Sequence, residues 1–173
     1  TTATDDSSSP YGNTYTIATN ATTSPGAKQI TGYNNANLTT PDTFTVTVDT
    51  TAPTGSGVTC PGTYDSDGTY SVTGTSGSDT GSDIDTANVY FQRRTGTLSG
   101  NSCSSYGSYS NQGSANATSL SQSGLASGCY EYLYSTKDLV GNATTSSTCV
   151  VKVDTGVPTT AVTIANASYS PST

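Results

Sequence analysis

The chain has 173 residues, of which 31% are hydrophobic and 10% charged, and its net charge at pH 7 is −7. An acidic chain repels nucleic-acid phosphates and anionic lipid headgroups, which excludes both as expected partners. With no His and a single Glu, neither a Ser-His-Asp nor a Cys-His catalytic arrangement can be built, and we do not expect an enzyme. No apolar run approaches the roughly 20 residues of a membrane-spanning helix.

Residues 1–54 end in an expected β-strand. Phe44, Val46 and Val48 alternate with threonines, a period of two that places all three on one face. Pro53 then ends the strand, because proline lacks an N–H donor for the ladder. A short, stiff connector follows, and the next strand begins near Val58.

Residues 55–157 predict about seven short strands separated by Gly- and Ser-rich turns. Within them Val89 and Phe91 face inward, and Tyr130, Tyr132 and Tyr134 share one face. Two weak strands are expected in 96–127, where the Ser, Asn and Gly content leaves the register open. The other strands are expected at 58–60, 69–75, 88–94, 129–136 and 147–153.

An internal repeat sets the expected domain organisation. The segment Val46-Thr-Val-Asp-Thr-Thr-Ala-Pro53-Thr54 returns as Val151-Lys-Val-Asp-Thr-Gly-Val-Pro158-Thr159, so Asp49 corresponds to Asp154 and the offset is 105 residues. That period is too long for a solenoid repeat and fits a whole small β-sandwich. We therefore expect one complete repeat, residues 55–157, flanked by partial repeats at 1–54 and 158–173.

The turn Asp138-Leu-Val-Gly-Asn142 follows the Tyr-led strand and precedes the second copy of that motif. Together with Gly81-Ser-Asp-Ile84, this pattern resembles the Ig-like repeats of large bacterial and archaeal surface proteins. The resemblance implies an all-β fold of antiparallel Ig-like sandwiches in tandem. It also implies a structural component of an extracellular or cell-surface fibre or filament. The alternative is an adhesin module that binds a glycan or a protein receptor.

How such a fibre would be assembled stays open between two interpretations. In the first, the chain is a window of a long continuous array, and its partners are neighbouring repeats. In the second, copies of the chain join head to tail. The C-terminal segment with Val162 and Ile164 would then complete the partial N-terminal repeat of a neighbour by strand donation.

Four cysteines without a CxxC pair or a His predict two disulfides rather than a zinc site, and hence an oxidising compartment. Four cysteines allow three connectivities, among which the sequence cannot choose. In the expected fold the first and last strands lie side by side, which favours Cys60–Cys149 and leaves Cys103–Cys129. Five N-glycosylation sequons agree with a surface location: Asn20, Asn37, Asn116, Asn142 and Asn166.

The acidic residues suggest one candidate metal site. Because the chain reverses at every strand, the turns at 78–85 and 138–142 should lie at the end where the repeat begins, beside the connector. Carboxylate oxygens are ligands that Ca²⁺ takes, although the Asp-x-Asp-x-Asp-Gly loop is missing. The competing interpretation is that these side chains only bond their own turns. The residues expected to converge are Asp49, Asp79, Asp83 and Asp138, and no other cofactor is expected.

Two further groups of side chains carry weaker expectations. Tyr106 and Tyr109 lie in a Ser- and Gly-rich loop, where tyrosines often make exposed contacts with a partner. Arg93 and Arg94 are interpreted as half buried and half solvated, and as no more than charges near the end of a strand.

Overall fold

The computed structural model describes residues 26–33 and 39–159. Every regular element among them is a β-strand except η1 (Thr86–Asn88), a single 3₁₀ turn that the Asp85 carboxylate caps. The expected all-β fold is confirmed for this part of the chain. β-branched Thr and Val supply the strands, and glycines with positive φ supply many of the turns between them.

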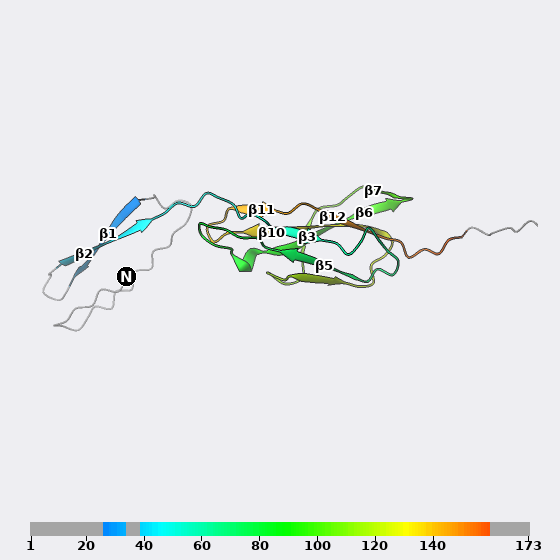
Figure 1. The fold of residues 1–173 in the computed structure, drawn as a ribbon, viewed down its shortest axis with the longest axis horizontal. Helices are drawn as coiled ribbons and strands as arrows, with labels where there is room; N and C mark the ends of the chain where they lie inside the picture. The colour runs from blue at the N-terminus through cyan, green and yellow to red at the C-terminus, as the bar shows by residue number, and fades with distance from the viewer. Residues whose placement is uncertain (1–25, 34–38, 160–173) are drawn as a thin grey trace, which may run out of the picture.

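The first two strands, β1 (Gly26–Tyr33) and β2 (Thr39–Val46), form an antiparallel hairpin at one end of the molecule (Figure 1). Val46 is buried and Phe44 is half-buried, as their alternation predicts. Val48 was expected to lie on the same face of this strand, and this expectation was wrong. The strand stops at Val46, and the Val48 side chain is 52% exposed in the segment that leads to the next sheet.

Residues 54–154 contain two sheets packed against each other. The smaller sheet has the order β3 (Gly57–Thr59), β5 (Tyr70–Thr75) and β9 (Ser119–Gln122). The larger sheet has the order β4 (Tyr64–Asp65), β12 (Cys149–Val153), β10 (Gly128–Lys137), β6 (Tyr90–Ser99) and β7 (Ser102–Ser104). In addition β11 (Ala143–Thr145) pairs with β10, and β8 (Ser110–Gln112) pairs with β6. We call this two-sheet body the sandwich.

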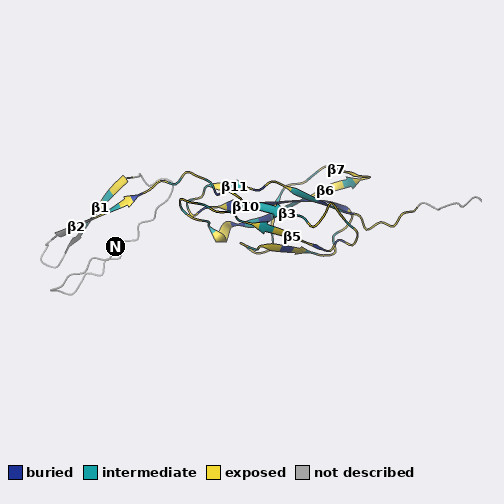
Figure 2. Ribbon diagram, viewed as in Figure 1, coloured by how far each residue is buried: buried dark blue, intermediate teal, exposed yellow. Residues whose placement is uncertain are grey.

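The hydrophobic core lies between the two sheets. Tyr70, Val72 and Leu120 come from the smaller sheet, while the larger sheet and its flank contribute Val89, Phe91, Tyr130, Tyr132, Tyr134, Val151 and Val153. Their burial confirms the inward face expected for Val89, Phe91 and the three tyrosines of β10. Figure 2 shows buried residues concentrated in the sandwich, whereas the hairpin residues that carry a burial colour are mostly exposed.

The strand count differs from the seven expected, because the described sandwich contains ten short strands from β3 to β12. The segment 96–127 holds β7, β8 and β9 rather than two strands. Turn residues hid the short strands β4 and β11, and β4 pairs in parallel with β12. All other described strand pairs are antiparallel.

The disulfides pair as preferred from the sequence, Cys60 with Cys149 and Cys103 with Cys129. The reason given for the first pair was wrong. β3 and β12 are not neighbours in one sheet; they belong to different sheets, and Cys60–Cys149 ties the two sheets together. Cys103–Cys129 joins β7 to β10 on the two sides of β6.

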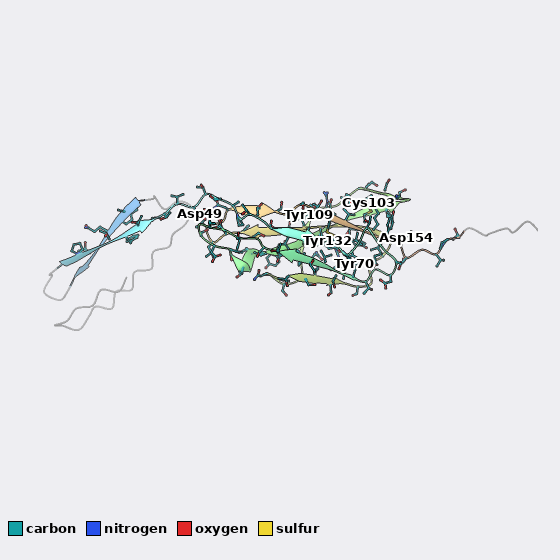
Figure 3. All side chains as sticks on the ribbon, viewed as in Figure 1. Asp49, Tyr70, Cys103, Tyr109, Tyr132 and Asp154 are labelled. Atoms are coloured by element: carbon teal, nitrogen blue, oxygen red, sulfur yellow. A yellow bond between two sulfur atoms is a disulfide. The ribbon has the colours of Figure 1, made fainter. Side chains whose placement is uncertain are left out.

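The chain enters and leaves the sandwich at opposite ends. Asp49 lies at the end that faces the hairpin, and Asp154 lies at the other end (Figure 3). We call these the proximal and the distal end. Residues 49–54 and 154–159, the two copies of the repeated motif, are called the first and the second connector.

Candidate functional site

The first connector is bonded to the proximal end by a short backbone ladder. Thr54 and Ser78 exchange two hydrogen bonds, each with an N···O distance of 2.9 Å. Gly77 makes this approach possible, because a Cβ atom there would lie 2.1 Å from the Thr54 carbonyl oxygen, and its φ of +73° also favours glycine. Pro53 is buried in the same region. The connector is therefore a docked segment and not a free linker.

A second contact comes from the turn between β10 and β11. The Asp138 Oδ1 atom accepts hydrogen bonds from the N–H groups of Val140, Gly141 and Asn142, at 3.0, 2.6 and 2.8 Å. The Asn142 side-chain amide donates to Asp138 Oδ2 at 2.6 Å and to the carbonyl oxygens of Asp49 and Thr51 at 3.2 and 3.4 Å. Asp138 thus shapes the turn, and Asn142 holds the connector by its main chain.

Asp49 and Asp79 complete the site from the other side. Asp49 accepts hydrogen bonds from the N–H of Thr51 at 3.0 Å and from that of Ser82 at 2.8 Å. Asp79 Oδ2 accepts from the N–H groups of Gly81, Ser82 and Asp83, at distances of 3.0, 2.9 and 3.1 Å. The backbone hydrogen bond from Thr51, followed by those from Ser82, lowers the pKa of Asp49. Asp49 is therefore held as a carboxylate that joins the connector to the turn after β5.

Three of the four expected carboxylates converge. Oxygen atoms of Asp49, Asp79 and Asp138 lie within 4.8 Å of one another. Gly81 allows this, because a Cβ atom there would lie 2.3 Å from Asp49 Oδ2. Asp83 does not join the group: its Oδ1 accepts from the N–H of Ile84, and its carbonyl accepts from the N–H of Leu139. Its φ of +71° places it at the reversal of the turn.

The donor set fits a hard cation, because Ca²⁺ takes carboxylate and carbonyl oxygens. The same oxygens already accept N–H groups of their own turns, as the Asx interpretation expects. These N–H groups carry partial positive charge and stabilise the carboxylates without an ion. Calcium binding at Asp49, Asp79 and Asp138 stays a prediction.

A second polar cluster covers the outer face of the larger sheet. Glu131 of β10 is 9% exposed and forms an ion pair with Arg94 of β6. The Arg94 guanidinium lies 4.6 Å from the ring centroid of Tyr106 and 4.7 Å from that of Tyr109, and the Tyr109 hydroxyl donates to Glu131 at 2.8 Å. Sequence reasoning missed this cluster, although the single Glu opposite two arginines was a usable signal.

Two expectations for these residues were therefore wrong. Tyr106 and Tyr109 are half-buried against Arg94 instead of standing free for a partner. Arg93 and Arg94 are half-buried as expected, but Arg93 is not merely a charge near a strand end, since it bonds Gln122 and lies 5.5 Å from the ring centroid of Tyr130. Burial raises the pKa of Glu131, but the hydrogen bonds from Arg94 and Tyr109 outweigh it, so the net pKa lies below the usual value.

The sequons fall into three groups. Asn116 is exposed and has a φ of +54°, so its side chain is accessible on a loop. Asn142 is half-buried, and its amide is used in the hydrogen bonds to the connector. A glycan on this amide would displace the connector. Asn20, Asn37 and Asn166 lie outside the described residues, as do Val162 and Ile164.

No protein-family model, curated protein or solved structure matches this chain significantly. Within residues 26–33 and 39–159, no helix has the length and apolarity needed to cross a bilayer. What can be said of function therefore comes from the site itself.

Proposed function

We propose that the chain is a structural module of an extracellular surface fibre, built from Ig-like sandwiches in tandem. The observation that carries this proposal is the docked first connector. Asn142, Asp49 and the Thr54–Ser78 ladder fix the segment that leads into the sandwich. A chain of domains keeps a defined direction only when such segments are fixed, because a free Gly- and Ser-rich linker behaves as a random coil.

The composition of the sandwich supports the same proposal. Two disulfides suit an oxidising compartment outside the cytoplasm. Most of the exposed residues that the structure describes are Ser, Thr, Asn and Gly, which do not form an apolar patch. The adhesin alternative has less support, because the two loop tyrosines expected to contact a receptor are packed against Arg94. Binding to a glycan array by the full chain would favour the adhesin.

Electron microscopy of the native assembly tests the fibre. The expected result is a filament whose axial repeat is close to the length of one sandwich. A dispersed, non-filamentous protein would contradict the proposal.

The stiffness of the first joint has its own test. Residual dipolar couplings of the full chain should give one alignment tensor for the β1–β2 hairpin and the sandwich. In Asn142→Ala the hairpin should reorient independently, because the two carbonyls of the connector lose their donor. Asn116→Ala, the matched change in the other described Asn-Ala-Thr sequon, should leave the tensor shared. Independent hairpin motion in the unmodified chain would contradict a stiff joint.

Calcium is the second part of the proposal, supported by the convergence of Asp49, Asp79 and Asp138. A bound Ca²⁺ would neutralise the mutual repulsion of these carboxylates and hold the connector more firmly. Calorimetric titration with Ca²⁺ should show a heat of binding. Thermal unfolding with Ca²⁺ present should show a higher melting temperature. Asp79→Asn should abolish both, whereas Asp67→Asn, a turn aspartate outside the cluster, should retain them. Absence of heat and of a melting shift in the unmodified chain would end the calcium proposal and leave the joint intact.

A further inference from the structure

The two connectors have the same sequence pattern and the same local turn. Asp49 Oδ1 accepts from the N–H of Thr51 at 3.0 Å, and Asp154 Oδ1 accepts from the N–H of Gly156 at 3.0 Å. The Asx turn that opens the repeated motif thus occurs at both ends of the sandwich. The second connector therefore begins with the same turn as the docked first connector.

The surroundings of the two connectors differ. In the first connector Pro53 is buried and Ala52 half-buried, whereas their equivalents Pro158 and Val157 are exposed, Val157 to 82%. The Asp49 carboxylate also reaches the Ser82 N–H of the turn after β5. Among the described residues, the Asp154 carboxylate bonds only the Gly156 N–H of its own turn, and the Asp154 N–H donates to the Asp65 carbonyl at 2.9 Å.

The groups that the first connector uses for docking are all present in the second. The Asn142 amide donates to the main-chain carbonyls of Asp49 and Thr51, whose equivalents in the second connector are Asp154 and Gly156. These bonds do not depend on the identity of the side chain, so the change from Thr51 to Gly156 does not remove them. The carboxylate that caps the Ser82 turn is an aspartate in both copies. Val157 replaces Ala52 and would bury more apolar surface than alanine does.

We infer that the second connector, residues 154–159, is a docking element whose partner is the proximal end of a second copy of this sandwich, placed head to tail. In that joint the Asp154 carboxylate accepts from the partner's Ser82 N–H, and the partner's Asn142 amide donates to the carbonyls of residues 154 and 156. Val157 and Pro158 become buried, as Ala52 and Pro53 are at the first joint. This inference rests on the proposed function, and it adds the identity of the partner surface.

The test is a tandem protein in which residues 1–159 continue directly into residues 55–173, so that the second connector meets a complete proximal end. Segmental isotope labelling and residual dipolar couplings then report the order between the two sandwiches. One alignment tensor should describe both sandwiches. Asp154→Ala in the first sandwich, and Asn142→Ala in the second sandwich only, should each give the two sandwiches separate tensors of different magnitude. Asn116→Ala in the second sandwich is the matched control and should leave the tensor shared.

Two outcomes overturn the inference. One is free reorientation of the two sandwiches in the unmodified tandem protein, and the other is rigid order that survives both Asp154→Ala and Asn142→Ala. The hairpin in the same sample separates this failure from that of the proposed function. If the hairpin stays aligned with the first sandwich while the second moves freely, only the docking of residues 154–159 is wrong.

Discussion

Strand β10 buries both of its faces, but the residues that cover the inner face differ in chemistry from those that cover the outer face. On the inner side Tyr130, Tyr132 and Tyr134 pack with Phe91 and the valines of the core. On the outer side Glu131 is covered by Arg94 and the loop tyrosines. The inner face is fixed mainly by apolar area, whereas the outer face is fixed by charge, hydrogen bonds and a disulfide. Substitutions on the inner face should therefore lower stability through lost apolar packing, and substitutions on the outer face through lost charge contacts, hydrogen bonds or the disulfide.

The largest effect is expected from Phe91→Ala on the inner face. Phe91 is fully buried, and its ring centroid lies 4.7 Å from that of Tyr134 in an edge-to-face arrangement. Removing the ring should lower the free energy of unfolding by about 3–5 kcal/mol, because it leaves a cavity that the sheets cannot fill. Urea denaturation followed by circular dichroism measures this. Leu139→Ala, at a side chain that is 64% exposed, is the control, and an equal loss there would contradict the assignment of the core.

The outer face should depend on the Cys103–Cys129 disulfide, which closes a loop of 26 residues next to the Arg94 cluster. Changing both cysteines to serine should lower the free energy of unfolding by roughly 3.5 kcal/mol on the chain-entropy estimate. NMR spectra should show changes at Tyr106 and Tyr109 before any at Tyr132. Equal disturbance of the inner tyrosines would mean that the two faces are not independent.

A smaller effect is expected inside the core, where the hydroxyls of Tyr70 and Tyr132 are hydrogen-bonded at 2.9 Å. Tyr132→Phe leaves the Tyr70 hydroxyl without this partner, and the expected loss is about 1–3 kcal/mol. The double variant with Tyr70→Phe should lose less than the sum of the two single variants. Additive losses in a double-mutant cycle would show that the hydroxyl pair contributes nothing specific.

The same hydroxyl pair makes the inner face sensitive to alkali. Desolvation raises the pKa of both Tyr70 and Tyr132. The folded chain therefore keeps two protons that the unfolded chain releases above about pH 10, and stability falls as the pH rises through that range. The double variant Tyr70→Phe with Tyr132→Phe should show a shallower fall. If stability falls equally steeply with pH in the double variant, the effect does not come from Tyr70 and Tyr132.

The smallest effect is expected for Glu131→Gln, about 1–2 kcal/mol at neutral pH, since the ion pair is only partly screened from water. Because the folded pKa of Glu131 is lowered, its contribution is complete above the unfolded pKa of about 4.3. It is lost as the pH falls through the lower folded value. Melting temperatures of the variant and the unmodified chain should therefore converge as the pH falls below the unfolded pKa, and a difference that stays constant throughout the acid range would contradict the ion pair.

Alternation in the sequence was sufficient for the inner face and for the three longest strands of the larger sheet, β6, β10 and β12. The outer face could not be derived in this way, because Glu131 meets Arg94 across 37 residues of sequence and Tyr109 across 22. Such contacts depend on the path of a Ser- and Gly-rich loop whose register the sequence leaves open.

The proximal site was only partly predictable from the sequence. Chain reversal was enough to bring Asp49, Asp79 and Asp138 together. The orientation of each carboxylate was not predictable, and Asp83 points back to its own turn because of its left-handed backbone. The role of Asn142, which reaches Asp49 across 93 residues, was not predictable, because the sequence shows this residue only as part of a turn and of a sequon.

The Cys60–Cys149 disulfide has a mechanical consequence. Tension applied between the two connectors passes along residues 54–60, crosses the disulfide and continues along residues 149–154, so it bypasses the 89-residue interval that the bridge spans. Pulling can therefore disturb the packing of the sandwich but cannot lengthen the chain by that interval. At about 3.3–3.6 Å per residue, roughly 300 Å of extended chain cannot be released until the bridge is reduced. Under load, the sandwich would therefore keep a nearly fixed length while the bridge is intact.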